Sequence, residues 1–418
     1  MGVSREANFF ELGGHSLMAA QLVSRLRAGA GLQLALREVF DHPVLRDMAT
    51  RLAPVGAGAS LPTLMPVARV GQMHLSPTQH RLWLVDRLSG SAARTGYNMA
   101  TALRFEGPLD PAVLRRALET LVSRHEVLRM AYPENDDGEP VATIAPVAAF
   151  DVPWIDLSPV APEADAARID AALEAMAAEP FDLANAAPLR ASLLHLGPGR
   201  HALLLCVHHI AFDGWSGAIF AREFVAAYEA LRADLPSTLP PLRVQYADYA
   251  VWHARMLEAT RAQDAAFWQR YLDNAPKGSR LPVDTPPPGV AGHAGDSLRV
   301  PVEGALVEAL APLARANKTS RFTVMLAAFL ALVHREAGTD DIVVGTDVAG
   351  RDHPELEKLM GFFVNVVPLR SRRDEAARFT DWLAAVHAGT QSALAHGGVP
   401  LVRILDLARL GRAQGTAG

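Results

Sequence analysis

This 418-residue sequence contains few residues that could cross-link it or hold it in a membrane. It has a single cysteine, Cys206, so neither an internal disulfide nor a cysteine-rich zinc site can form, which is typical of a reducing compartment. The longest mainly apolar stretch near its middle, residues 322–333, is well short of the ~20 residues that a membrane-spanning helix needs. We expect that stretch to be a buried core helix. The N-terminus has no signal-peptide pattern, and we expect a cytoplasmic protein.

An excess of positive charge is also missing. The sequence has 40 Lys and Arg against 45 Asp and Glu, a formal net charge of -5, and so has no basic field that would attract nucleic acid or an anionic membrane. Half of the residues are hydrophobic and 20% are charged, which excludes a disordered or fibrous chain. We therefore expect two or three folded domains, with no nucleic-acid or membrane partner.

The first 53 residues predict a small helical unit. Gly13 and Gly14 precede a run of apolar residues at helical spacing, and a second amphipathic run follows Pro43. A stretch rich in alanine, glycine and proline comes next, where the apolar periodicity stops. We assign residues 54–73 to a linker.

From about residue 61 onward the patterns predict a mixture of strands and helices. Asp110 and Pro111 form an N-cap and first-turn pair before an apolar helix. Two apolar runs on either side of residues 197–200 (GPGR) predict a β-hairpin, and a long helix is expected over residues 215–232. The proline-rich residues 281–289 divide this large region in two.

Residues 207–216 (VHHIAFDGWS) are the most informative segment, because an apolar strand meets a helix there. Side chains alternate along a strand, so His208 and His209 should point to opposite faces and cannot readily share a metal ion. We predict no metal site, and no nucleophilic role for Cys206. One histidine should be chemical and the other structural; taken alone, the pair is also compatible with two satisfied histidines near a strand end.

This segment resembles the HHxxxDG motif of condensation domains in nonribosomal peptide synthetases, and five other blocks resemble further motifs of that family in the same order. The blocks are residues 76–83 (SPTQHRLW), 124–129 (RHEVLR), 246–252 (YADYAVW), 361–365 (GFFVN) and 396–401 (HGGVPL). Thr78 stands where the family commonly has alanine, and the last block is a degenerate form of HQDxPFE. One HHxxxDG is only moderately specific, because other acyltransferases carry it, whereas six ordered blocks are a strong signal.

The N-terminal unit has a resemblance of its own. Residues 8–17 (NFFELGGHSL) are similar to the signature of peptidyl carrier domains, and residues 37–44 (REVFDHPV) resemble a later helix boundary of the same family. The resemblance implies that Ser16 receives a covalent 4'-phosphopantetheine, and a serine at a helix N-terminus suits a phosphodiester because the helix dipole favours negative charge. The alternative is that Ser16 only caps its helix.

Together the resemblances imply an α/β fold. Two lobes resembling chloramphenicol acetyltransferase would form a condensation domain with its active site in the cleft between them, preceded by a partial helical carrier domain. The carrier lacks its first helix and the chain stops soon after the sixth block, so we expect a synthetase fragment with apolar surface left exposed near residues 342–344 and 362–364. Our assignment is a carrier at 1–53, a linker at 54–73, an N-terminal lobe at 74–255 and a truncated C-terminal lobe at 256–418.

The implied reaction is peptide-bond formation between two carrier-bound thioesters, a donor and an acceptor whose amine attacks the donor carbonyl. The resemblance assigns His209 to accept the ammonium proton of the tetrahedral intermediate or to orient the amine, and a usual histidine pKa of about 6.5 suits both roles. His208 and Gly214 belong to the same motif, and Gly214 would let the backbone turn tightly or approach the substrate.

Asp213 is expected to be structural, because a buried carboxylate needs a partner. Comparison with the family makes Arg124 or Arg129 its counter-ion.

Three alternatives stay open. An epimerase-type relative also carries HHxxxDG, but carriers before epimerases usually have aspartate where His15 stands. An acyltransferase that uses coenzyme A would have no use for Ser16, and an inactive docking fragment would not need an intact motif. The expected partners are upstream and downstream carrier and adenylation domains, a phosphopantetheinyl transferase and the aminoacyl or peptidyl thioesters, whose amino acids the sequence leaves open.

Overall fold

The computed structural model describes residues 3–14, 16–34, 36–54, 61–88, 94–158, 162–276, 281, 298–374 and 376–408. The chain divides into two compact units. Unit I contains residues 62–256 and 355–363, and unit II contains residues 1–61, 257–354 and 364–418. Within the described ranges, no helix is both long and apolar enough to cross a membrane.

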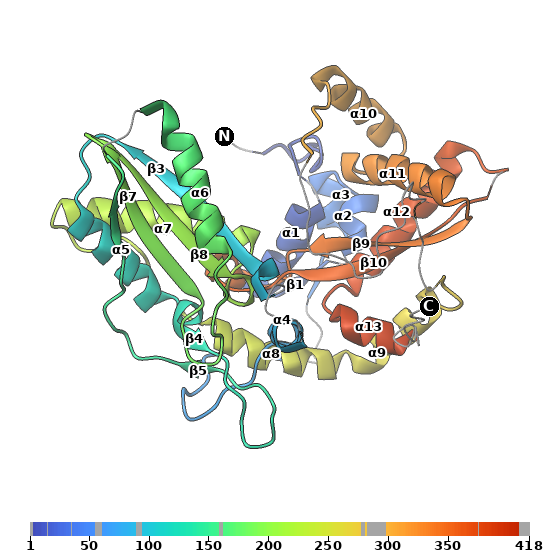
Figure 1. The fold of residues 1–418 in the computed structure, drawn as a ribbon. Helices are drawn as coiled ribbons and strands as arrows, with labels where there is room; N and C mark the ends of the chain where they lie inside the picture. The colour runs from blue at the N-terminus through green and yellow to red at the C-terminus, as the bar shows by residue number, and fades with distance from the viewer. Residues whose placement is uncertain are drawn as a thin grey trace, which may run out of the picture. The chain divides into compact units, whose positions relative to one another are not determined.

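Unit I is built on a four-stranded sheet with the order β3-β8-β7-β6, of which Figure 1 labels β3, β7 and β8. The strands are β3 (Asn98–Glu106), β6 (Trp154–Asp156), β7 (Leu189–Gly197) and β8 (Arg200–His208). β3, β8 and β7 pair antiparallel, and β6 joins β7 in parallel. The predicted hairpin is confirmed: its turn needs glycine, since Gly197 and Gly199 have φ angles of 136° and 66°.

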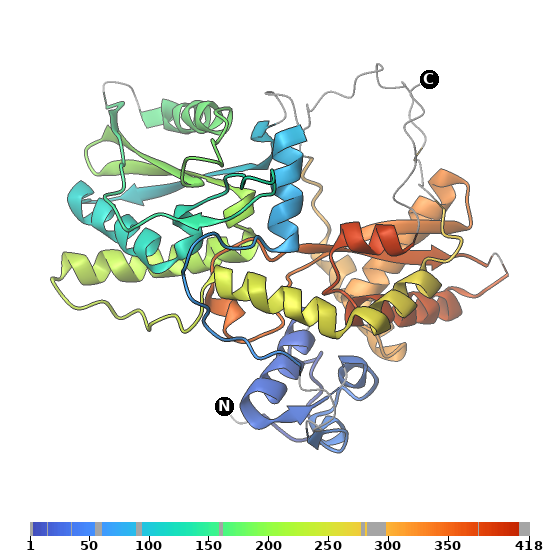
Figure 2. The same cartoon turned by 90° about the horizontal axis from the view of Figure 1, so that it is seen from below.

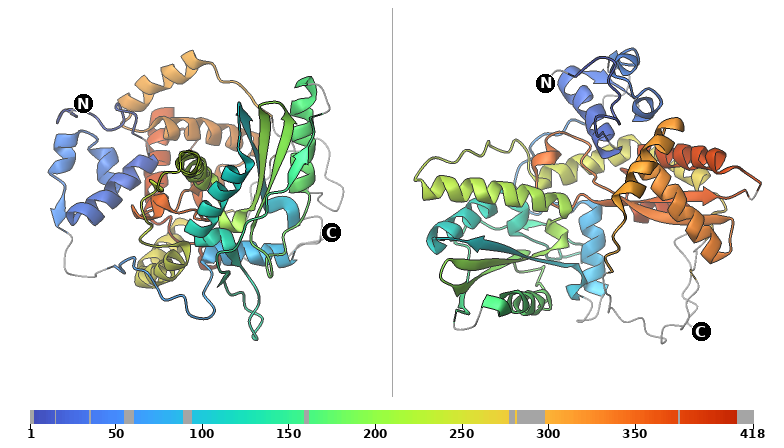
Figure 3. Two further views of the ribbon diagram at one scale, coloured as in Figure 1. Left: turned by 90° about the vertical axis from the view of Figure 1, so that its left-hand side faces the viewer. Right: turned by 90° about the horizontal axis from the view of Figure 1, so that it is seen from above.

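Helices cover both faces of this sheet, as Figure 3 shows, with α6 (Asp165–Ala177) on one side and α5 (Pro111–Arg124) and α7 (Gly214–Arg232) on the other. α5 begins as predicted, because the Asp110 carboxylate accepts hydrogen bonds from the main-chain nitrogens of Ala112 and Val113. β8 is buried along almost its whole length, as expected for a central strand covered on both faces. Pairing with β3 and β7 and cover by helices on both faces therefore fix the position of the end of β8.

Shorter elements complete unit I. They are α4 (Pro77–Leu88), β4 (Met130–Ala131), β5 (Thr143–Ile144), α8 (Tyr246–Ala259), which extends past residue 256, and the 3-10 turns η1 (Arg94–Tyr97), η2 (Glu126–Arg129), η3 (Pro162–Ala164), η4 (His209–Ala211) and η5 (Leu356–Lys358). Part of the expected linker is packed against α8. The buried Asp248 carboxylate accepts a hydrogen bond from the Val67 nitrogen at 2.7 Å and pairs with Arg69.

Unit II contains the antiparallel pair β9 (Asp341–Val348) and β10 (Asn365–Arg372). Its helices are α9 (Arg261–Tyr271), α10 (Gly304–Ala316), α11 (Arg321–Ala337), α12 (Phe379–Ala395) and α13 (Leu401–Leu407). The helix expected over residues 322–333 is confirmed, but it is not a fully buried one. Phe322, Met325, Phe329 and Leu332 are between 41% and 52% exposed, because only the opposite face of α11 packs into the core.

The N-terminal residues form the predicted helical unit, drawn in blue in Figure 2. It comprises α1 (Ser16–Ala30), α2 (Leu36–Asp41) and α3 (Leu45–Ala49), with a small pair of strands, β1 (Leu32–Gln33) and β2 (Ala53–Pro54). Ala19, Leu34, Val39 and Met48 form its core. The proline-rich division expected at 281–289 lies outside the described residues except for Leu281.

Candidate functional site

The predicted junction between a strand and a helix is present at the end of β8. His208 is the last residue of that strand, and His209 begins the short turn η4 (His209–Ala211). Asp213 then caps α7, whose first residue is Gly214. Because β8 ends at His208 and the turn begins at His209, the two histidine side chains have different surroundings.

His208 is a buried, neutral histidine. Its side chain is 1% exposed, and its Nδ1 accepts a hydrogen bond from the Ile210 nitrogen at 3.2 Å. Burial, with a smaller contribution from the neighbouring His209, lowers the pKa of His208 to about 4. At neutral pH this ring carries no charge, which supports a structural role for it.

His209 is partly buried and packs against an aromatic ring. Its ring centroid lies 4.7 Å from that of Phe362, with 68° between the planes. Nδ1 of His209 is buried and has no hydrogen-bond partner within the part of the chain that the structure describes. The ring is thus held by packing rather than by a hydrogen bond at that nitrogen.

Asp213 is completely buried and fixes two pieces of backbone. Its Oδ1 accepts hydrogen bonds from the nitrogen and hydroxyl of Ser216, at 2.8 and 2.7 Å, which caps α7. Its Oδ2 accepts a hydrogen bond from the Phe363 nitrogen at 3.2 Å. The carboxylate is occupied by structural bonds, which supports the role expected for it.

The expected ion pairs of Asp213 with Arg124 or Arg129 do not form, and this part of the prediction is wrong. Arg124 turns toward α7, where its Nε lies 3.0 Å from Oε2 of Glu223. Arg129 donates to the carbonyl oxygen of Ala145. Glu223, on the buried face of α7, therefore forms the ion pair with Arg124 that was expected for Asp213.

Gly214 does not need the freedom of glycine to make its turn. Its φ is not positive, and a Cβ added there would meet no atom within 4 Å. The expectation that a tight turn requires glycine at this position is therefore not supported. Open space beside Gly214 fits the other expectation, a close approach of substrate to the backbone.

Residues 355–363, here called the clasped segment, are held by hydrogen bonds from the motif blocks. Trp215 Nε1 donates to the Glu357 carbonyl at 3.1 Å, and the Met360 nitrogen donates to Nδ1 of His125 at 3.4 Å. Two hydroxyl groups, of Tyr246 and Thr78, donate to the Phe362 carbonyl at 2.5 and 3.1 Å. Four of the six blocks therefore bond to this short segment, which itself contains the start of a fifth.

The clasped segment also corrects an expectation about exposed apolar surface. Phe362 and Phe363, expected beside an uncovered sheet, are 4% and 1% exposed. They lie before β10 rather than within a strand, and Phe363 packs its ring against Tyr246 and Tyr249 at centroid distances of 4.9 and 4.6 Å. Tyr246 and Tyr249 of the YADYAVW block therefore cover the ring of Phe363.

A buried charge cluster lies behind this segment and was not predicted. Nε2 of His125 is 2.7 Å from Oε2 of Glu223. Burial lowers the pKa of His125 despite that carboxylate. Burial alone would raise the pKa of Glu223, but His125 and Arg124 together hold it below its usual value. The position of Glu223 on the apolar stripe of residues 215–232 was the available signal.

The first block contacts the histidine turn directly. Nε2 of Gln79 donates to the Ile210 carbonyl at 3.2 Å and to the Tyr132 hydroxyl at 3.1 Å. Tyr132 was also missed, because nothing near it in the sequence distinguishes it from a core aromatic residue. Burial raises its pKa well above 10.

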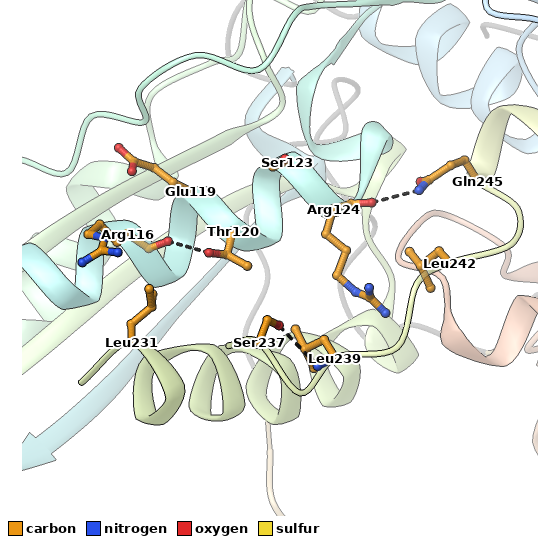
Figure 4. Close-up of a pocket in the computed structure, with 10 residues that line it drawn as sticks. All are labelled: Arg116, Glu119, Thr120, Ser123, Arg124, Leu231, Ser237, Leu239, Leu242 and Gln245. Atoms are coloured by element: carbon orange, nitrogen blue, oxygen red, sulfur yellow. Dashed lines mark hydrogen bonds between the residues drawn. The ribbon is translucent and has the colours of Figure 1, made fainter. Parts of the chain in front are cut away.

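A cavity of about 570 Å³ lies on another part of unit I. Figure 4 shows its lining from α5, the end of α7 and the connection to α8, with Arg124 and Gln245 at one end. None of the HHxxxDG residues lines it, so it is separate from the histidine turn. Among the described residues, no group of three or more His, Cys, Asp or Glu side chains could hold a metal ion.

The start of α1 fits an attached phosphodiester. Gly13 has a φ of 95°, and a Cβ at Gly14 would overlap the ring of Phe9, so both positions require glycine. The chain then enters a 15-residue helix at Ser16 with no acidic residue in its first turn, which leaves the positive end of the helix dipole uncompensated. The side chain of Ser16 itself lies outside the described residues.

Comparison with known proteins agrees with this geometry. The family described as "Condensation domain" matches residues 70–417. The chain belongs to the condensation-domain family. The family described as "Phosphopantetheine attachment site" matches residues 2–52, so the covalent cofactor of this N-terminal part is 4'-phosphopantetheine, as predicted. The assignment of that cofactor to Ser16 stays a prediction.

Several curated condensation-domain relatives are components of peptide synthases. One component of the linear gramicidin synthase of Brevibacillus parabrevis is 38% identical over 409 residues, which are 97% of this chain and 8% of that protein. One component of the plipastatin synthase of Bacillus subtilis (strain 168) is 34% identical over 407 residues, which are 97% of this chain and 11% of that protein. The chain thus spans about a tenth of the length of these relatives.

Solved structures confirm the predicted mixed α/β condensation fold. The complex of the X-domain and OxyB from teicoplanin biosynthesis matches with a TM-score of 0.75 and 28% identity, covering 84% of this chain and 76% of that one. The first condensation domain of the calcium-dependent antibiotic synthetase, with a substrate analogue, matches with a TM-score of 0.67 and 26% identity, covering 82% and 78%.

Proposed function

We propose that this chain forms an amide bond between two thioesters, each held on a carrier domain. The observation that carries the proposal is the difference between the two histidines. His208 is buried and neutral at the end of β8, whereas His209 is only partly buried where that strand turns toward α7. A condensation domain of this kind would use His209 on the reacting amine.

The acceptor amine does not need to be deprotonated by the protein before it attacks the donor carbonyl. An α-amino group has a pKa of about 7.7 to 8.0, so much of it is a free nucleophile near neutral pH. As its nitrogen bonds to the donor carbonyl carbon, the nitrogen becomes cationic. Loss of that proton and cleavage of the C–S bond give the amide and a thiol. His209 would accept the proton or orient the amine, and both roles stay within the proposal.

The same proposal includes the carrier and its partners. Ser16 at the start of α1 would hold the phosphopantetheinyl group, whose thiol carries an acyl chain as a thioester. A phosphopantetheinyl transferase would load it, and adenylation and further carrier domains would supply the substrates in the cytoplasm. Residues 1–53 would act as the carrier, 54–73 as the linker, and 74–255 and 256–418 as the two lobes.

The proposal is tested by the form of donor that the protein accepts. The protein is given an acceptor aminoacyl carrier and the same donor acyl group either on a carrier or on coenzyme A, and the acceptor carrier is weighed by mass spectrometry. We expect elongation of the acceptor only with the carrier-bound donor. Equal elongation from coenzyme A would favour the acyltransferase alternative, and elongation from neither would contradict amide formation.

A second candidate function is the binding of a partner protein without catalysis. It is favoured by one observation: the TM-score to an X-domain that was solved in complex with OxyB is 0.75, which is higher than the 0.67 to the condensation domain of the calcium-dependent antibiotic synthetase. Intact His208, His209 and Asp213 weigh against it. A protein that binds a loaded carrier but never elongates it would support this second candidate.

A further inference from the structure

We propose that Phe362 is a positioning residue that holds the imidazole of His209 in its working orientation. The consequence for catalysis rests on the function proposed above, whereas the contact itself rests on unit I alone. Phe362 lies on the clasped segment, and His209 lies on η4, about 150 residues earlier in the chain.

The ring of His209 needs support from packing. In catalytic triads a carboxylate on Nδ1 fixes the orientation and tautomer of the histidine. Within the described residues, Nδ1 of His209 is buried without such a partner. The structure shows a contact of the His209 ring with the Phe362 ring, edge-on at 4.7 Å and 68°, which is within the favourable range for aromatic pairs.

Phe362 is itself held in place by burial and by hydrogen bonds to its carbonyl, so its ring can restrict the orientation of the His209 ring. Its side chain is almost fully buried, and its carbonyl accepts hydrogen bonds from the hydroxyl groups of Tyr246 at 2.5 Å and Thr78 at 3.1 Å. Thr78 occupies a position where the family commonly has alanine, so this second hydrogen bond depends on the residue that this chain has there. Two donors on one carbonyl restrict rotation of the peptide plane that carries the ring.

The residues on either side of Phe362 are held by the histidine motif. The Ser216 hydroxyl accepts from the Gly361 nitrogen at 3.0 Å and is within 3.1 Å of its carbonyl oxygen, and Asp213 accepts from the Phe363 nitrogen. Gly361 has a φ of 152°, and a Cβ there would overlap the Tyr246 ring. His209 and Phe362 are therefore tied to the same local framework.

A purely structural role for Phe362 makes a different prediction. If the ring only filled the core, its loss would lower stability and leave the imidazole of His209 unchanged. Phe224 provides a matched control, because it is an equally buried phenylalanine of unit I whose ring neighbours are Phe105, Phe220 and Tyr228. Phe362→Leu and Phe224→Leu remove the same ring from two buried sites.

The test measures the His209 ring directly in the whole protein labelled with 15N-histidine. Its signals are those lost in His209→Gln. We expect the ring 15N shifts of His209 to differ between the wild type and Phe362→Leu. Phe362→Tyr, which keeps the ring, should restore the wild-type shifts, and Phe224→Leu should leave them unchanged. Unchanged His209 15N shifts in Phe362→Leu would overturn the proposal.

Kinetics give the second readout. With loaded carriers, kcat for amide formation should fall about tenfold to a hundredfold in Phe362→Leu with KM nearly unchanged, because a misplaced catalytic group costs rate rather than binding. If Phe362→Leu does not fold, Thr78→Ala decides: its His209 signals must shift, or the proposal is wrong. A wild type that makes no amide counts against the proposed function, while the 15N shifts still decide the role of Phe362.

Discussion

The main-chain nitrogen of Phe363 donates a hydrogen bond to Oδ2 of Asp213 at 3.2 Å, across 150 residues of sequence. This bond joins the HHxxxDG block to the GFFVN block. The same carboxylate caps α7 through Ser216, so one buried side chain fixes a helix start and the segment that packs on His209.

Asp213→Ala should lower the stability of the protein markedly. It removes the cap of α7, worth about 1 kcal/mol, and leaves the buried Phe363 nitrogen without an acceptor, worth about 1 to 3 kcal/mol. We expect a loss of about 2 to 4 kcal/mol by urea unfolding. Asp110→Ala, which removes only the exposed cap of α5, should cost about 1 kcal/mol. Equal losses in the two variants would contradict the structural role of Asp213.

His208 should make the protein sensitive to mild acid. Its pKa is about 4 in the folded state against about 6.5 for an ordinary histidine, so between these values only the unfolded chain binds the proton. Its contribution to stability is complete above pH 6.5 and is lost as pH falls toward 4, by about 3 kcal/mol. His208→Gln should flatten the fall in urea midpoint over that window. An unchanged slope would show that His208 titrates normally.

Ser16 should accept one phosphopantetheinyl group. Incubation with coenzyme A and a phosphopantetheinyl transferase should add the mass of that group to the intact protein. Ser16→Ala should abolish the addition, whereas Ser4→Ala, at an exposed serine earlier in the same unit, should not. Addition that survives in Ser16→Ala would refute the assignment of this residue.

Local patterns were sufficient to predict much of the fold. The Asp110 cap, the glycine-rich hairpin at Gly197 and the long helix after Asp213 all depend on neighbours in sequence, and all three are present. The resemblance of six blocks extended these elements to a family fold. The degree of burial was harder to predict, because the exposed face of α11 is as apolar as its buried face.

The partners of the site residues could not be predicted, because they depend on tertiary packing. Arg124 pairs with Glu223 instead of Asp213 since the buried face of α7 brings that glutamate to the end of α5. The contact of Phe362 with His209 joins positions far apart in sequence. No local period indicates such a pair, and only the folded backbone brings the two rings together.

The central claim is that His209 acts on the amine during amide formation. The most direct test is a single turnover between loaded donor and acceptor carriers, comparing the wild type, His209→Ala and His195→Ala, a histidine of β7 that pairs with Asp156. We predict that His209→Ala lowers the rate of amide formation about a hundredfold or more while its melting temperature stays near that of the wild type, and that His195→Ala keeps the wild-type rate. A folded His209→Ala protein that forms amide at the wild-type rate would contradict the account.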